Sequence, residues 1–231
     1  VGTGEFTDSL MMDEITGIAE RLIRNTAKHK NIFLEFKTKS DCVDHLHDIE
    51  EKGSTVLAWT LNTPVNINLY EKDTALLESR INAAVKAGQS GFLLAFHFDP
   101  IIMYDGYIKD YNSVIDSLAE KISPDRVVWI SLGCFRYSPG FKDIIKHKYP
   151  DSIITCEEMF PGIDGKYRYL KKTRIGIYSF FYKRLKSIFP KAYIYFCMES
   201  SDVWSSVTGI EFASSDELEG AMGRSLKINF L

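Results

Sequence analysis

Polar and charged side chains follow nearly every apolar run of the sequence, at the points where predicted strands end. They are Glu5, Thr7 and Asp8; Lys37 and Lys39; Thr60 and Asn62; His97 and Asp99; Arg136; Glu157 and Glu158; and Glu199. Any one of them can simply cap the helix that comes next. In parallel α/β proteins, however, the carboxyl ends of the strands meet at one edge of the sheet, where ligands bind. The series of polar strand ends therefore predicts a ligand site at that edge.

The residues alone leave two further functions open. Glu5, Glu157 and Glu199 are compatible with the acid and nucleophile carboxylates of a barrel glycoside hydrolase. Residues 166–174 are basic with interleaved tyrosines. That composition is typical of a non-catalytic nucleic-acid-binding module, where cations track phosphates and aromatic rings stack on bases. A solvated loop that leads into a helix explains the same composition.

Short β-rich apolar runs alternate with longer helical patterns, and these elements must position the polar strand ends. The predicted strands are 31–36, 55–61, 91–98, 126–132, 152–155 and 192–197. The predicted helices are 13–30, 41–52, 74–87, 111–122, 140–148 and 173–189. The strands are apolar on both faces, as expected when other layers cover both sides of a sheet. The pattern predicts an α/β fold built from parallel βαβ units.

Composition excludes several classes of protein. The chain has 231 residues, of which 45% are hydrophobic and 26% charged, with a net charge of −3. No apolar run approaches the ~20 residues of a membrane span, so no membrane partner is expected. A nucleic-acid partner must meet a local basic patch, because the overall charge is slightly repulsive. The four scattered cysteines suit a reducing cytoplasm.

The two ends of the chain differ from its middle. Residues 1–8 resemble the end of a strand that already enters a functional loop. We interpret the chain as a fragment that lacks its N-terminal part. Residues 201–231 are weakly patterned and are predicted to form a loosely attached tail. The segment 160–172 is the one long irregular connection, and such connections are often functional.

Several short motifs follow one another in a specific order. They are GEFTDSL at 4–10, FKTKS at 36–40, TLN at 60–62, GFLLAFHFDPII at 91–102, YDGY at 104–107, KYRY at 166–169 and RIGIY at 174–178. In order and spacing they resemble the spore photoproduct lyase family of radical S-adenosylmethionine enzymes, over about residues 1–200. The resemblance implies an incomplete parallel (β/α)6 partial barrel over 1–200. It also implies a reaction on DNA, in which a deoxyadenosyl radical reverses thymine-dimer damage.

The resemblance assigns roles to particular residues. Those at cofactor-contacting positions are Gly4, Glu5, Thr7, Lys39, Thr60, Asn62 and Asp99, which are expected to bind S-adenosylmethionine. Lys39 can pair with the cofactor carboxylate, and Glu5 can accept from its ammonium group. Thr60 and Asn62 lie two residues apart on one predicted strand and therefore face the same way. The residues expected to meet the damaged DNA are Arg136, Arg168 and Tyr169. No catalytic residue and no oligomeric state are assigned.

Two departures from the family pattern qualify this picture. The Cys-x3-Cys-x2-Cys motif that holds the [4Fe–4S] cluster is absent, and Cys42, Cys134, Cys156 and Cys197 do not replace it. The cluster is therefore expected only in the full-length protein, and this chain alone is expected to be inactive. Glu5 occupies the position of the family's hydrogen-donating cysteine, which points to a different substrate. No metal ligands are assigned, because His45 and His47 would face different ways on a helix.

Overall fold

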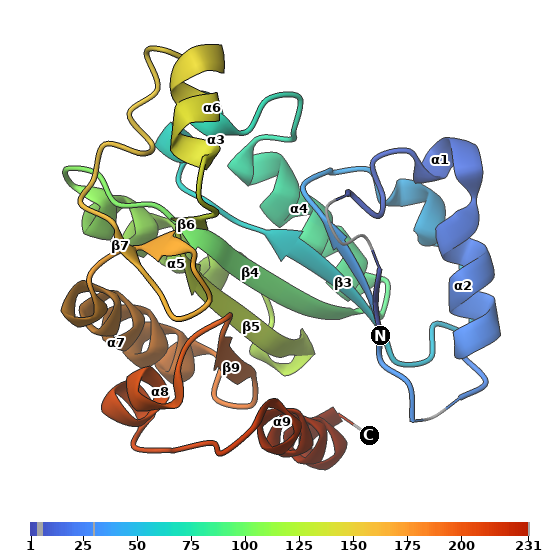
Figure 1. Cartoon of the computed structure of the whole chain (residues 1–231). Helices are drawn as coiled ribbons and strands as arrows, with labels where there is room; N and C mark the ends of the chain where they lie inside the picture. Colours follow the sequence, from blue (N-terminus) through green and yellow to red (C-terminus); the bar gives the residue numbers. More distant parts are fainter. Residues whose placement is uncertain (4–6, 30, 231) are drawn as a thin grey trace.

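The fold is built on an open, fully parallel sheet (Figure 1), in a computed structural model that describes residues 1–3, 7–29 and 31–230. The strand order is β1-β2-β3-β4-β5-β9, and every neighbouring pair is parallel. The strands are β1 (Gly2–Thr3), β2 (Leu34–Thr38), β3 (Thr55–Thr60), β4 (Leu93–Ile101), β5 (Val127–Cys134) and β9 (Tyr193–Phe196). This arrangement confirms the predicted α/β partial barrel, with the first strand at an edge.

Helices connect the strands, and most of them cover the outer face of the sheet, whereas α9 packs on the inner face. They are α1 (Asp13–Thr16), α2 (Ile18–Thr26), α3 (Pro64–Tyr70), α4 (Leu77–Gln89), α5 (Tyr107–Lys121), α6 (Phe141–Lys148), α7 (Lys171–Ile188), α8 (Ser201–Thr208) and α9 (Ser215–Phe230). Short 3-10 turns lie at Asp44–Leu46 and Pro124–Arg126. A small antiparallel sheet joins β6 (Arg136–Tyr137), β8 (Tyr167–Arg168) and β7 (Phe160–Pro161). None of the described helices combines the length and apolar character that a membrane crossing requires.

The two faces of the sheet bury different clusters. On β3, Leu57 and Trp59 belong to the large core beneath the helices, whereas Val56 and Ala58 belong to a smaller cluster on the inner face. The alternation follows from the period of two along a strand. Leu226 of α9 completes the inner cluster, and α9 lies beside β9 (dark red in Figure 1). The inner face is therefore apolar and covered at one end, and its other end carries the polar residues described below.

Two predicted elements are wrong. The predicted helix over 41–52 contains only the short turn Asp44–Leu46. Val43, Leu46 and Ile49 are buried at a spacing of three residues, which suits a 3-10 turn as well as a helix. The Ser40 side chain accepts from the Cys42 N–H at 3.1 Å, and such local bonds compete with helix formation.

The predicted strand over 152–155 is a turn, and β9 is the sixth strand of the sheet. The backbone N–H of Ser152 bonds to the carbonyl of Tyr149 at 3.0 Å, which closes the turn after α6. Residues 201–230 contain the helices α8 and α9 rather than an unpatterned segment. Trp204 of α8 is buried against Phe196, with ring centroids 4.4 Å apart. The division of the chain at residue 200 stays a prediction.

Candidate functional site

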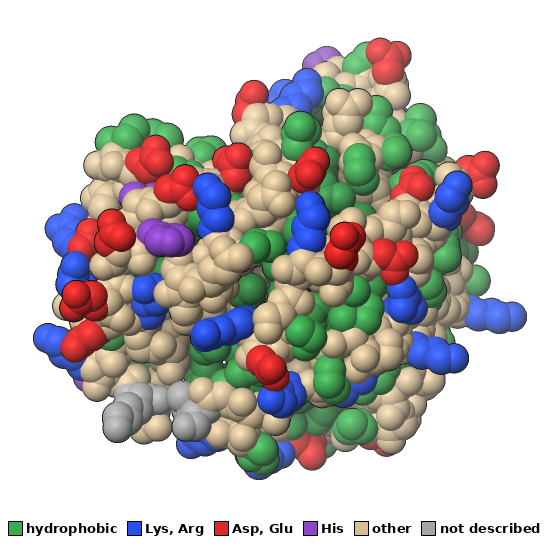
Figure 2. Space-filling view, turned by 180° about the vertical axis from the view of Figure 1, so that it is seen from behind, with side chains coloured by type: hydrophobic (Ala, Val, Ile, Leu, Met, Phe, Trp, Pro, Cys, Tyr) green, Lys and Arg blue, Asp and Glu red, His purple; other side chains and the backbone are tan. Residues whose placement is uncertain are grey.

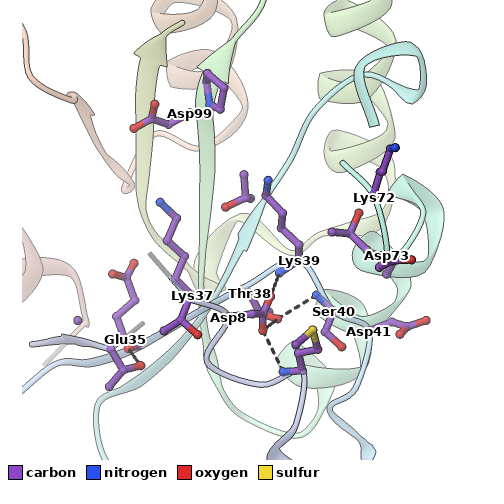
Figure 3. A pocket seen from close by; sticks show the side chains of 18 of the residues that line it. Asp8, Glu35, Lys37, Thr38, Lys39, Ser40, Asp41, Lys72, Asp73 and Asp99 are labelled. Carbon is purple, nitrogen blue, oxygen red and sulfur yellow. Dashed lines mark hydrogen bonds between the residues drawn. The ribbon is translucent and has the colours of Figure 1, made fainter. Parts of the chain in front are cut away.

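A cavity of about 1230 Å³ lies at the carboxyl ends of the first strands. Its walls come from β2, β3 and β4, from the loop after β1 and from the segment 72–75. Figure 3 shows Lys37 and Lys39 extending from the end of β2 into the same space that Asp99 borders. The cavity therefore occupies the edge at which the sequence predicts a ligand site.

The structure brings together half of the residues that the sequence assigns to a site. The lining residues among them are Thr7, Lys39, Thr60, Asp99 and Arg136. Gly4 and Glu5 lie outside the described residues. Asn62, Arg168 and Tyr169 do not line the cavity, although Lys166 of the same basic segment does. The cofactor and substrate roles of all these residues stay predictions.

Asn62 turns away from the cavity because the strand ends before it. β3 ends at Thr60, so the alternation that would place both side chains on one face is lost. The Asn62 side chain is 1% exposed, and its oxygen accepts from the Tyr111 hydroxyl at 2.7 Å and from the Asn66 amide at 2.8 Å. It thus links three elements inside the core.

Asp8 fixes the loop after β1 against the end of β2. Its carboxylate accepts from the backbone N–H groups of Leu10 and Met11, each at 2.9 Å. It also accepts from the Thr38 hydroxyl at 2.7 Å and from the Lys39 N–H at 2.6 Å. The dashed lines in Figure 3 mark bonds of this carboxylate. Four donors on one carboxylate make this wall of the cavity well defined.

Lys39 is held by a buried ion-pair chain that the sequence did not reveal. Its Nζ lies 3.3 Å from Glu71 Oε1, and Glu71 Oε2 accepts from Arg80 at 2.7 Å. Arg80 is fully buried and also donates to the Thr60 carbonyl at 2.8 Å. One feature of the sequence could have indicated this chain of ion pairs. Arg80 lies among the apolar residues Ile81 and Ala84 of α4, and an arginine in such surroundings normally has a buried acidic partner.

Asp99 and Arg136 form a second pair across the cavity wall. An Arg136 Nη atom lies 3.0 Å from Asp99 Oδ1, and the other Nη lies 3.3 Å from Cys197 Sγ. Burial alone would raise the pKa of Asp99, but the Arg136 guanidinium outweighs burial and holds that pKa below its usual value. A Cβ at Gly133 would lie 2.5 Å from the Asp99 carboxyl, so only glycine leaves room for this contact.

Glu35 connects the cavity to the inner face of the sheet. Its Oε1 lies 2.9 Å from His97 Nε2 and accepts from Trp129 Nε1 at 2.9 Å. Burial alone would raise the pKa of Glu35, but the hydrogen bonds from His97 and Trp129 and the charge of His97 outweigh burial and hold that pKa below its usual value. His97 is buried and hydrogen-bonded to Glu35, so it does not present a free ring to the cavity. Glu35 lies inside β2 rather than at its end, so the pattern of polar strand ends does not indicate it.

The charged side chains of the cavity differ in how far they are paired. Asp8, Glu35 and Asp99 accept hydrogen bonds from protein groups, and Lys39 and Arg136 are paired with carboxylates. Lys37 has no carboxylate within ion-pairing distance among the described residues, and Lys166 has only the sulfur of Met198, at 3.6 Å. The cavity therefore offers free positive charge to a ligand with anionic groups.

Most cations of the segment 166–174 are neutralised by carboxylates. Arg168 donates to Asp164 at 2.6 Å and to the Met198 carbonyl at 3.1 Å. Lys171 pairs with Asp202, and Arg174 Nε lies 2.8 Å from Glu199 Oε1.

Tyr169 lies beneath the same segment. It is 2% exposed, and its hydroxyl accepts from the Met103 N–H at 3.0 Å. In this conformation the ring is part of the core, so Tyr169 does not present a face on which a base could stack.

Of the three carboxylates of the glycoside hydrolase alternative, Glu5 lies outside the described residues, and the other two do not converge on the cavity. Glu199 accepts from Arg174 and from the Tyr178 hydroxyl, and neither Glu157 nor Glu199 lines the cavity. The cysteines are equally dispersed. Cys134 is buried, Cys156 is exposed, and no three cysteines of the described residues come close enough to share a metal centre. The described residues thus do not supply a set of cysteine ligands for a [4Fe–4S] cluster.

Comparison with known proteins gives consistent matches. The sequence model of the spore photoproduct lyase family matches residues 4–198. The spore photoproduct lyase of Bacillus subtilis (strain 168) is 28% identical over 180 residues, which are 77% of this chain and 51% of the relative. That of Clostridium acetobutylicum is 24% identical over 194 residues, 81% of this chain and 57% of the relative. The chain spans about half the length of the curated relatives it matches.

Solved structures show the same fold. A spore photoproduct lyase complexed with dinucleoside spore photoproduct has a TM-score of 0.75 and 25% identity, and the match covers 83% of this chain and 59% of that one. A variant with bound AdoMet and dinucleoside spore photoproduct has a TM-score of 0.75 at 24% identity, with 85% and 60% covered. The family match begins just after β1, includes every later strand of both sheets and ends before α8. The chain therefore belongs to the spore photoproduct lyase family.

Proposed function

We propose that this chain serves in a spore photoproduct lyase that reverses thymine-dimer damage in DNA, with S-adenosylmethionine bound in the cavity at the strand ends. One observation carries the proposal. In a chain of this family, Thr7, Lys39 and Thr60 line a single cavity with Asp99 and Arg136. Related spore photoproduct lyase structures are complexes with the lesion dinucleoside and with AdoMet, which supports the same pair of ligands here.

The chemistry of the cavity suits S-adenosylmethionine, which carries a carboxylate as well as an ammonium and a sulfonium group. Lys37 has no carboxylate partner among the residues that the structure describes, and Lys39 can exchange Glu71 for the cofactor carboxylate. Asp99 offers an acceptor on the opposite wall. In the family, bound S-adenosylmethionine supplies the radical that removes hydrogen from the lesion. The part of this chain is to bind and orient the cofactor, with Asp8 holding the wall that carries Lys39.

The described residues do not supply cysteines for an iron–sulfur cluster, so we assign no step through a cluster to them. We expect this polypeptide alone to bind ligands without turning over the lesion. A product assay on the isolated chain tests this expectation, with a complete spore photoproduct lyase of the family as the positive control. Turnover by the isolated chain would overturn the expectation.

DNA is proposed to approach from the cavity mouth. On the face in Figure 2, lysine and arginine side chains are interspersed with aspartate and glutamate, so that face offers mixed charge. Arg136 and Lys166 border the cavity and can meet a phosphate beside the lesion. The side chains of Arg168 and Tyr169 bond to other parts of the protein, and a direct DNA contact by either stays a prediction. The pairing of Lys171 and Arg174 with carboxylates disfavours an independent nucleic-acid module.

Calorimetric titration with S-adenosylmethionine tests the cofactor assignment. We expect saturable binding by the chain, weakened about tenfold in Lys37→Ala through loss of one charge pair. Lys109→Ala is the matched control, since Lys109 is exposed on α5 and does not line the cavity. Absence of binding, or equal losses in both variants, would overturn the assignment. A parallel titration with dinucleoside spore photoproduct tests the substrate side with Arg136→Ala.

A further inference from the structure

Three metal-ligating side chains of different types meet outside the ligand cavity. They are Glu14 of α1, and Cys42 and His45 of the connection between β2 and β3. A carboxylate oxygen, the thiol sulfur and a ring nitrogen all lie within 4.8 Å of one another. Among residues 1–3, 7–29 and 31–230, no other three His, Cys, Asp or Glu side chains come as close.

The orientation of His45 is fixed from behind. Its Nε2 lies 2.8 Å from Asp13 Oδ2, and Asp13 is buried. The other Asp13 oxygen accepts from the Ala19 N–H at 2.9 Å and from the Thr16 hydroxyl at 3.1 Å. The carboxylate is therefore held in place, and it favours the tautomer with a proton on Nε2. A carboxylate behind a histidine is the usual support of a metal-binding imidazole.

The second ring nitrogen of His45 has no partner. Nδ1 is buried and makes no hydrogen bond to any described residue. Buried polar nitrogens are normally satisfied, and an orphaned one indicates a missing water or ion. With Nε2 bonded to Asp13, Nδ1 is the ring nitrogen left for a ligand.

We propose that Glu14, Cys42 and His45 bind a zinc ion. A thiolate, an imidazole and a carboxylate form a mixed donor set that suits zinc, whereas magnesium and calcium prefer oxygen donors alone. Ligands at tetrahedral zinc distances lie about 3.5–4 Å from one another. The observed group is close to that spacing, and Glu14 is exposed and free to adjust.

A second cavity gives the ion access and room for a fourth ligand. It has a volume of about 520 Å³ and is lined by Glu14, Cys42 and Asp41, among others. Structural zinc sites have four ligands, so a water molecule or a further side chain at this cavity, such as Asp41, would complete the set. Asp41 also lines the larger cavity, so the two sites are neighbours.

The position of the site suggests what the ion does. Cys42 follows closely after Lys39, and Glu14 follows closely after Asp8. An ion between them ties together the two loops that form one wall of the ligand cavity. We therefore assign it a structural role that positions Lys39, independent of the proposed reaction. The sequence did not reveal the site, because it combines Cys42 and His45 with a third ligand from a distant segment.

Cobalt substitution of the metal-free chain is the direct test. Co²⁺ should bind one equivalent and give a thiolate-to-cobalt absorption band together with intense tetrahedral bands, and Zn²⁺ should displace it. Cys42→Ser should lose the thiolate band and weaken zinc binding at least 100-fold in competition with a chromophoric chelator. Cys156→Ser is the matched control, because Cys156 is an exposed cysteine outside the group, and it should leave both unchanged.

Asp13→Asn tests the support of His45. It should weaken zinc binding about 10- to 100-fold while the thiolate band remains. X-ray absorption of the zinc-loaded natural chain should show one sulfur ligand, a readout that does not depend on any variant folding. Zinc bound without sulfur, or equally tight binding by Cys42→Ser, would overturn the proposal. So would a spectrum of octahedral cobalt without a thiolate band.

Discussion

The Asp99 carboxylate and the Arg136 guanidinium join the two sheets of the molecule, with Oδ1 3.0 Å from the nearest Nη. Asp99 lies near the carboxyl end of β4 in the parallel sheet, and Arg136 is the first residue of β6 in the small antiparallel sheet. The pair thus fixes the small sheet, which forms part of the cavity wall, against the parallel sheet. Both side chains are largely buried, so that removal of one leaves the other without compensation.

Arg136→Ala should lower the free energy of unfolding at neutral pH by roughly 2 kcal/mol, below the range for fully buried pairs because this pair is partly accessible. The pKa of Asp99 in the folded chain is below its usual value. The stability that the ionised Asp99 contributes is therefore complete above the unfolded pKa of about 4, and it is lost as pH falls through the folded pKa. The difference in unfolding free energy between the natural chain and Arg136→Ala should therefore become smaller toward acid pH. Urea unfolding across a pH series measures this difference, and Arg126→Ala at an exposed arginine is the control.

Gly133→Ala should destabilise the chain by about 1–3 kcal/mol, since overpacking at a buried site costs this much. Its Cβ would lie 2.5 Å from Asp99 Cγ, on a strand that cannot retreat without losing its neighbours. Gly176→Ala on α7 is the matched control, because a Cβ there meets nothing within 4 Å. Helix propensity even favours alanine at that position. Thermal unfolding of the two variants compares them, and equal midpoints would contradict the crowding at Gly133.

Asp8→Asn should loosen the wall that carries Lys39. An amide presents an N–H₂ where the carboxylate accepts from the Lys39 N–H, so at least one of the four bonds is lost. We expect a loss of about 1–2 kcal/mol in stability together with weaker S-adenosylmethionine binding. Asp48→Asn is the control, because Asp48 is exposed on the connection after β2. Unchanged unfolding and binding in Asp8→Asn would show that the carboxylate does not hold the loop.

The features that the sequence predicts are those set by local periodicity. Apolar runs placed β3, β4 and β5 correctly, and the rule that strand ends converge brought Lys39 and Thr60 to one cavity. Glu35 and Glu71 escaped prediction for the opposite reason. Their roles depend on distant partners, His97 and Arg80, that only the folded chain brings near.

Two mistaken predictions, the helix over 41–52 and the unpatterned C-terminal segment, also depend on contacts that local periodicity does not reveal. The spacing of buried residues over 41–52 fits both a helix and a loop with one turn, and side-chain bonds to the backbone decided between them. The C-terminal segment has weak amphipathic character because α9 contacts the sheet through one narrow stripe. A short stripe of apolar residues does not stand out without knowledge of the surface that it covers.

Leu226→Asp should separate α9 from the inner face of the sheet. Leu226 is 5% exposed and packs with Val56, Ala95 and Trp129, so a carboxylate there must either lose its hydration or pull the helix away. We expect a loss of at least about 3 kcal/mol in unfolding free energy, together with stronger binding of a hydrophobic dye to the uncovered face. Ile228→Asp is the matched control, because Ile228 lies on the same helix and is 82% exposed. If both variants unfold at the same urea concentration and bind the dye equally, α9 does not cover the sheet in solution.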